Sequence, residues 1–193
     1  MRREPILPLM PRATPLKTVD DYFALDDDGR TELLDGVFVV SPSPSYGHQR
    51  AVLRLAVALD RQVEGPGLGE VLFAPLDVVL CPTTVAHPDV LFVSTAHLHR
   101  IDRHLEGPPD LAVEFLAPSN PENDLDRKMK LYLESGVPQY WIGNLETRTI
   151  RVLENAGDHW IEIGTFAPGS VIRPAGMPGV IVEVSEVYEV GAP

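Results

Sequence analysis

The sequence predicts a mixed α/β fold, in which a mixed β-sheet combines with two principal helices. Short runs rich in Val, Leu and Ile, separated by Pro, Gly or polar residues, recur along the chain and are typical of strands. Two longer segments place apolar residues at every third or fourth position, which is the period of an amphipathic helix. With 193 residues and 44% hydrophobic content, the chain can bury one substantial core.

The first predicted elements are a short helix and a hairpin. Thr18 is followed three positions later by an acidic residue, as in a capping box, which predicts a helix over residues 18–26. Residues 32–40 predict two short strands around the turn Asp35-Gly36. We expect one domain over residues 18–188, between a proline-rich arm at 1–17 and a tail at 189–193.

The central part predicts one long helix and then several strands. Residues 46–63 carry apolar side chains at helical spacing and end before Gly65-Pro66-Gly67. Four strand-like runs follow, at 71–74, 77–81, 89–93 and 111–116.

The last third predicts a second helix and further strands. Residues 122–135 place Leu and aromatic side chains on one helical face, and Gly136 ends the segment. Further strand candidates are residues 139–142, 149–153, 160–165 and 180–184.

Composition narrows the class of protein. The single cysteine, Cys81, excludes an intramolecular disulfide framework and a thiolate zinc site. No apolar run approaches the ~20 residues of a membrane helix, and the start of the chain is too broken by proline for a signal segment. These features predict a soluble cytoplasmic protein with no membrane partner.

The net charge of −12 is unfavourable for binding nucleic acid, because phosphate contacts need local Lys and Arg. Basic side chains do gather in two segments, although such clusters are also typical of solvated loops and helix faces. They are His97, His99, Arg100, Arg103 and His104, and then Arg127, Lys128 and Lys130.

Glu114 is the most informative residue, because it interrupts the apolar run 111–116. An ionised carboxylate in a buried strand costs several kcal/mol unless a cation or hydrogen bonds compensate it. Asp89 opens a neighbouring strand candidate, so the two carboxylates converge if the strands pair. Mg²⁺ prefers one or two carboxylates together with water and phosphate oxygens. The alternatives are a turn aspartate at 89 and a structural ion pair at 114.

Lys128 follows Glu114 by fourteen residues and lies on the second predicted helix. Lys128 also follows Asp124 by four positions, and the simplest interpretation of that spacing is an ion pair between the two on the helix surface. The functional interpretation is that Lys128 points to Glu114 and stabilises the negative charge of an attacking hydroxide or a phosphoryl transition state.

Several motifs in one order resemble the Uma2 family, formerly DUF820, over about residues 18–185. The residues that carry the resemblance are Glu32-Leu33-Leu34-Asp35-Gly36, His48-Gln49, Pro88 to Val93, Gly107 to Ser119, Asp124, Lys128, Tyr132, Gly136-Val137-Pro138 and Tyr140-Trp141-Ile142.

The resemblance implies a restriction-endonuclease-like fold of the PD-(D/E)xK superfamily, a mixed sheet flanked by helices with additional N-terminal and C-terminal strands. It also implies a Mg²⁺-dependent site, with Mn²⁺ as a substitute. Carried over to this sequence, it makes Asp89 and Glu114 the metal-binding carboxylates, Lys128 the catalytic lysine and Glu32 an additional acidic residue. His48 and Gln49 are placed at the edge of the site, although a surface histidine is the simpler reading of His48.

The chain departs from the superfamily pattern at a few positions. The lysine is usually two residues after the glutamate, where this chain has Leu116, so the assignment requires the lysine to lie on the helix. Gln139 replaces a common glutamate, a change that can alter hydrogen bonding around the site. Tyr132 and Trp141 are expected to be core residues.

The expected function is therefore a metal-dependent endonuclease that hydrolyses phosphodiester bonds of nucleic acid, with DNA as the expected substrate. The alternatives are a binding or regulatory protein that retains the fold, and a metallohydrolase of small phosphoesters. Apolar edge-strand candidates near the C-terminus add a homodimer to these expectations.

Overall fold

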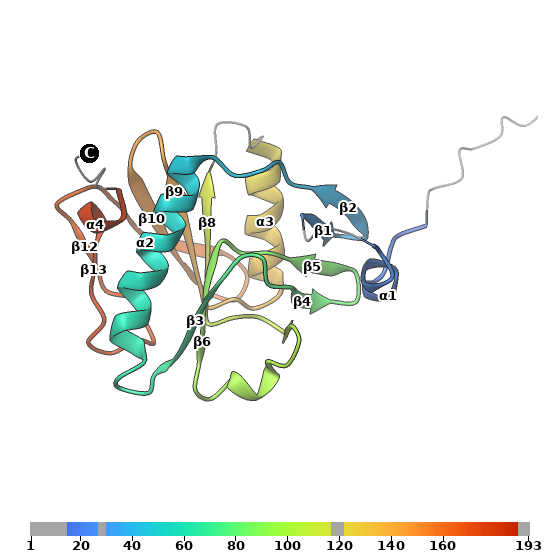
Figure 1. Cartoon of the computed structure of the whole chain (residues 1–193), viewed down its shortest axis with the longest axis horizontal. Helices are drawn as coiled ribbons and strands as arrows, with labels where there is room; N and C mark the ends of the chain where they lie inside the picture. Colours follow the sequence, from blue (N-terminus) through green and yellow to red (C-terminus); the bar gives the residue numbers. More distant parts are fainter. Residues whose placement is uncertain (1–14, 27–29, 117–121, 189–193) are drawn as a thin grey trace, which may run out of the picture.

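A six-stranded mixed sheet forms the centre of the molecule (Figure 1). The computed structural model describes residues 15–26, 30–116 and 122–188, without the side chains of residues 122–124. Within the sheet β8 and β9 are parallel, and every other neighbouring pair is antiparallel. In spatial order the strands are β11 (Trp160–Phe166), β10 (Thr149–Asn155), β9 (Gln139–Asn144), β8 (Leu111–Leu116), β6 (Val90–Ser94) and β3 (Gly69–Phe73).

Two helices cover opposite faces of this sheet, and Figure 1 shows them on either side of β8. Helix α2 (Tyr46–Val63) packs its apolar side on one face, against Val113, Phe115 and Trp141. Helix α3 (Glu122–Glu134) lies on the other face and buries Tyr132 against Tyr140. Because side chains alternate along a strand, Glu114 of β8 points to the α3 side while its neighbours Val113 and Phe115 point to α2.

A second, five-stranded mixed sheet lies beside α3. The hairpin of its first two strands turns at Asp35 and Gly36, whose φ angles of 47° and 71° are those of a type I′ turn. Arg127 of α3 donates a hydrogen bond to the Leu34 carbonyl and so ties the hairpin to the helix. The strands in spatial order are β2 (Val37–Val40), β1 (Thr31–Leu34), β5 (Thr84–Ala86), β4 (Val78–Cys81) and β7 (Leu105–Glu106).

Short elements complete the described chain. Helix α1 (Val19–Phe23) begins at a capping box of Thr18 and Asp21, as the sequence predicts. A 3₁₀ turn, η1, spans Leu98–Arg100. Strands β12 (Val171–Ile172) and β13 (Val182–Glu183) pair with each other, and helix α4 (Val184–Tyr188) packs beside α2.

The fold class predicted from the sequence is confirmed, and the two principal helices lie where their periodicity places them. The prediction of a strand over 180–184 was wrong in its extent, because only Val182–Glu183 is extended and α4 starts at Val184. Strands β5, β7 and β12 have two or three residues each, too few for a periodic signal. The strands also divide between two principal sheets. In the described ranges no helix has the length and apolar character needed to span a membrane.

Candidate active site

A buried ion-pair cluster lies between β8, α3 and the hairpin. Lys128 extends from α3 so that its Nζ is 3.0 Å from Glu114 Oε1 and 3.0 Å from Glu32 Oε1. All three residues are buried, and Glu32 is only 2% exposed. Glu32 also accepts a hydrogen bond of 2.8 Å from the backbone N–H of His87. One ammonium group therefore joins carboxylates from two different sheets.

Tyr132 lies one turn after Lys128 on α3 and also contacts the carboxylate of Glu114. Its hydroxyl donates a 2.8 Å hydrogen bond to Glu114 Oε1, the oxygen that Lys128 also contacts. Oε1 is thus engaged by two donors. No hydrogen bond from a described residue engages Glu114 Oε2, so this oxygen is available to a ligand.

Asp89 lies at the start of β6, next to Glu114 of β8. Val90 is opposite Val113 in the antiparallel pair, so Asp89 comes one position beyond it, level with Glu114. Asp89 Oδ2 accepts a 2.7 Å hydrogen bond from the Phe115 backbone N–H and lies 3.1 Å from His48 Nε2. These contacts fix one oxygen, and within the described chain no hydrogen bond engages Oδ1.

The charges of the cluster do not balance, because Asp89, Glu114 and Glu32 face the cation of Lys128 and the imidazole of His48. Burial raises the pKa of Glu114, and the charges of Asp89 and Glu32 raise it further, while Lys128 and Tyr132 oppose the shift. For Lys128 burial works against the cation, yet Glu114 and Glu32 outweigh burial and raise its pKa. Lys128 is accordingly a permanent cation, and Glu114 favours its ionised form only when more positive charge arrives.

His48 is buried at the inner face of α2. Burial disfavours its charged form, but the hydrogen bond and charge of Asp89 outweigh burial and raise the pKa of His48 above 6.5. Nδ1 of His48 is buried and has no partner among the described residues. The surface position that is the simpler reading of the sequence is therefore wrong for His48.

The available donor set suits a hard divalent cation. Asp89 and Glu114 present one free carboxylate oxygen each, and Mg²⁺ is commonly held by one or two carboxylates with water and phosphate in the other positions. An added dication would also offset the excess negative charge. The described residues include no group of three or more His, Cys, Asp or Glu side chains that could form an all-protein metal site.

The structure brings together five of the six residues singled out in the sequence, namely Asp89, Glu114, Lys128, Glu32 and His48. Gln49 is different, because it is exposed on α2 and its backbone N–H bonds to Ser45. The side chain of Asp124, the alternative partner of Lys128, lies outside the described residues. Glu32 is buried, although its place in the predicted hairpin would by itself suggest an exposed carboxylate.

Several groups that support the cluster were not predicted from the sequence. Tyr132 is a core residue as expected, but its hydroxyl also orients Glu114. The His87 imidazole lies 2.7 Å from Asp77 Oδ1, and Tyr22 donates a 2.7 Å hydrogen bond to the same oxygen. These contacts fix the backbone that binds Glu32. In the sequence, the feature that pointed to these supporting contacts was His87, directly before Pro88-Asp89.

Fold and cluster together define a restriction-endonuclease-like protein. Comparison with known families supports this class: the Uma2 profile, described as a putative restriction endonuclease, matches residues 19–185. The chain therefore belongs to the Uma2 family. No curated protein matches it significantly in sequence.

A solved structure has the same fold. It is that of a putative nuclease of DUF820 from Anabaena variabilis ATCC 29413, with a TM-score of 0.77 and 15% sequence identity. The similarity covers 89% of this chain and 97% of the other. At this identity the similarity concerns the fold alone.

Proposed function

We propose that the protein is a Mg²⁺-dependent endonuclease that hydrolyses phosphodiester bonds of nucleic acid, with DNA as its substrate. The observation that carries the proposal is the placement of Asp89 and Glu114 at one end of β6 and β8, with one oxygen of each fixed and the other available. Membership of the Uma2 family supports the same reaction class.

Asp89 and Glu114 are the residues that would hold the ion, with Mn²⁺ as a substitute for Mg²⁺. Such an ion lowers the pKa of water and neutralises charge on the phosphoryl group. The chain's own contribution is to fix both carboxylates before the ion arrives: Phe115 and His48 orient Asp89, and Tyr132 orients Glu114.

Lys128 acts as a donor of hydrogen bonds and positive charge. An ammonium group has three N–H donors, and Glu114 and Glu32 accept two of them. The third can orient the attacking water or stabilise an oxygen of the phosphoryl transition state. Because both carboxylates raise its pKa, Lys128 is not the base that removes a proton from water.

Calorimetric titration of Mg²⁺ and Mn²⁺ into the wild type, Asp89→Asn and Glu114→Gln tests the proposal, followed by cleavage assays on single- and double-stranded DNA and on RNA. We expect metal binding in the wild type, loss of binding in both variants, and metal-dependent cleavage only in the wild type. Glu162→Gln is the matched control, because this exposed glutamate lies on the edge strand β11. Unchanged binding in both variants would make Glu114 a structural ion-pair residue.

The net charge of −12 supports a second candidate, a binding or regulatory protein that retains the fold without catalysis. Such a protein would show no metal affinity that depends on Asp89 and Glu114. A third candidate, a hydrolase of small phosphoesters, tolerates an acidic surface better. Cleavage of nucleotide esters without cleavage of polymers would select it.

We also propose a homodimer, formed through the edge of the six-stranded sheet. Among the described residues, strand β11 pairs with β10 alone, and it exposes Ile161 and Ile163, each 49% accessible. Apolar edge strands of this kind favour pairing with another chain. Light scattering that gives the mass of a monomer, unchanged in Ile163→Lys, would contradict the dimer.

A further inference from the structure

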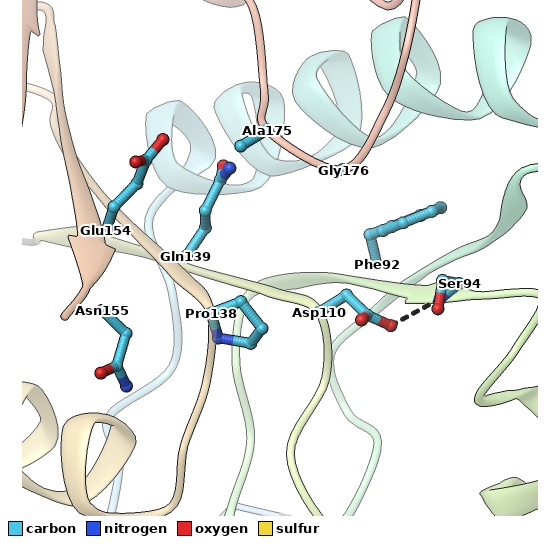
Figure 2. Close-up of a pocket in the computed structure, with 9 residues that line it drawn as sticks. All are labelled: Phe92, Ser94, Asp110, Pro138, Gln139, Glu154, Asn155, Ala175 and Gly176. Carbon is cyan, nitrogen blue, oxygen red and sulfur yellow. Dashed lines mark hydrogen bonds between the residues drawn. The ribbon is translucent and has the colours of Figure 1, made fainter. Parts of the chain in front are cut away.

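A cavity lies at the other end of the six-stranded sheet from the ion-pair cluster. Ser94 ends β6 and Asp110 immediately precedes β8, whereas Asp89 precedes β6, so the cavity and the cluster are at opposite strand ends. Its volume is about 210 Å³, room for about seven water molecules and less than a drug-sized ligand needs. The lining residues are Phe92, Ser94, Asp110, Pro138, Gln139, Glu154, Asn155, Ala175 and Gly176 (Figure 2).

A cross-strand pair supplies the polar groups of the cavity that remain free. Gln139 of β9 is directly opposite Glu154 of β10, so both side chains leave the same face of the sheet, and Figure 2 shows them next to each other. Gln139 is 3% exposed, and its Oε1 accepts a 3.2 Å hydrogen bond from Trp141 Nε1. That bond orients the amide, and Nε2 has no hydrogen-bond partner among the described residues.

The carboxylate of Glu154 is also free, because no described residue donates to it or forms an ion pair with it. The other polar groups are committed. Asp110 accepts the Ser94 backbone N–H at 2.7 Å and lies 3.0 Å from His97 Nδ1. The Asn155 amide bonds to the carbonyls of Leu133 and Val137.

Ser94, His97 and Asp110 do not form a catalytic triad. Ser94 Oγ and the Asp110 carboxylate both contact Nδ1 of His97, whereas proton transfer through a histidine needs its two different nitrogens. Ser94 and Asp110 form part of the cavity wall, and the chemistry available to a ligand is that of Gln139 and Glu154.

We propose that the cavity binds a guanine base, as free guanine or guanosine. The base carries an acceptor, O6, beside two donors, N1–H and N2–H. Gln139 Nε2 donates to O6, and the two oxygens of Glu154 accept from N1–H and N2–H, in the parallel arrangement that carboxylates favour. Phe92 and Pro138 supply the apolar surface for the ring.

Charge selects the form of the ligand. Asp110 and Glu154 are acidic, and the described residues that line the cavity include no Lys or Arg, so a phosphate group is disfavoured there. Free base and nucleoside should therefore bind better than a nucleotide or a guanine within a strand. This inference is independent of the proposed nuclease activity, since no residue is shared between the two sites.

Calorimetric titration with guanosine, inosine, adenosine and GMP tests the inference, with a guanine-containing single-stranded oligonucleotide and the cation agmatine as further ligands. We expect guanosine to bind best. Inosine lacks the N2 amine and should bind about tenfold more weakly, as should GMP.

Two variants reverse the two halves of the recognition pattern. Gln139→Glu replaces the donor to O6 by an acceptor, and Glu154→Gln replaces an acceptor by a donor. Each variant should therefore lower the affinity for guanosine at least about tenfold. Gln139→Glu introduces a charge at a buried position, so circular dichroism must check that this variant is folded. Glu154 is only half-buried, so Glu154→Gln does not carry the same risk of misfolding. Glu162→Gln on β11 is the charge-matched control and should bind as the wild type does.

Other outcomes overturn the inference. Equal affinity for guanosine and adenosine, absence of guanosine binding, or unchanged binding in Glu154→Gln would each contradict it. Binding of agmatine alone would make the cavity a cation site. Preference for the oligonucleotide over guanosine would make it part of a nucleic-acid interface.

Discussion

The ammonium group of Lys128 lies 3.0 Å from the carboxylate of Glu114, although one residue belongs to helix α3 and the other to strand β8. A cation that arrives from a different element lowers the cost of negative charge inside an otherwise apolar layer, although it does not fully offset the burial of Glu114. The same ammonium reaches Glu32 of the hairpin. Helix α3, the central sheet and the hairpin are thus joined by charge as well as by apolar packing.

Replacing Lys128 by Met should destabilise the fold by about 3–5 kcal/mol, because it leaves Glu114 and Glu32 buried without their cation. Urea denaturation at neutral pH measures the free energy of unfolding. The double variant Lys128→Met/Glu114→Gln should recover part of this loss, since it also removes one of the two carboxylates. Additive effects of the two substitutions would contradict direct coupling between them.

The raised pKa of Glu114 makes the stability of the metal-free protein depend on pH. The folded chain retains a proton on Glu114 that the unfolded chain releases near its ordinary pKa of 4.5. The resulting stabilisation is complete below that value and is lost as pH rises through the raised folded pKa. We expect the free energy of unfolding to fall over this range, and to fall less in Glu114→Gln.

His48 adds a similar fall above its ordinary value of 6.5, because Asp89 raises its pKa. Comparison of the wild type with Glu114→Gln at each pH removes this contribution, since both proteins contain His48. A wild-type profile identical to that of Glu114→Gln would refute the raised pKa. With Mg²⁺ present the affinity should increase with pH over the same range, because the ion needs the ionised carboxylate.

Replacing Tyr132 by Phe should cost about 1–2 kcal/mol of stability, because the hydroxyl and Glu114 Oε1 are hydrogen-bonded in the interior. A second effect separates positioning from packing. Loss of a donor to the carboxylate raises the pKa of Glu114 further, so the pH profile of Mg²⁺ binding should move to higher pH. Lower stability with an unmoved profile would give Tyr132 a packing role alone.

Sequence reasoning placed the principal elements because their signals are local. Helix α2 follows from its apolar period and its Gly-Pro-Gly end, and the hairpin from Asp35-Gly36. The division into two sheets was not predictable in this way, because it depends on which strands pair across the chain. Strand β5, for example, has three residues and pairs with β1, about fifty positions earlier.

The site residues also differ in whether a local sequence signal or a long-range contact determines their position. An isolated acid in an apolar strand marked Glu114, and its neighbour Asp89 followed from strand pairing. The burial of Glu32 and His48 was hidden, because the elements that cover them come from distant parts of the sequence. The role of Tyr132 could not be predicted, because a tyrosine whose hydroxyl bonds to a buried carboxylate occupies the same position in the helical pattern as a tyrosine that only packs in the core.

Gly143 links the packing of the sheet to the position of Asp89. It lies opposite Phe115 in the parallel pair of β8 and β9, and a Cβ atom at this position would be 2.3 Å from the Phe115 ring. Gly143→Ala must therefore displace that ring, at a cost of about 1–3 kcal/mol. Since the Phe115 backbone N–H holds Asp89 at 2.7 Å, the displacement should also weaken Mg²⁺ binding. Gly65→Ala is the control for the loss of a glycine alone, because a Cβ there meets nothing within 4 Å and its φ angle lies outside the left-handed region. Calorimetry should show weaker binding only in Gly143→Ala, and equal affinities would disconnect Phe115 from the metal site.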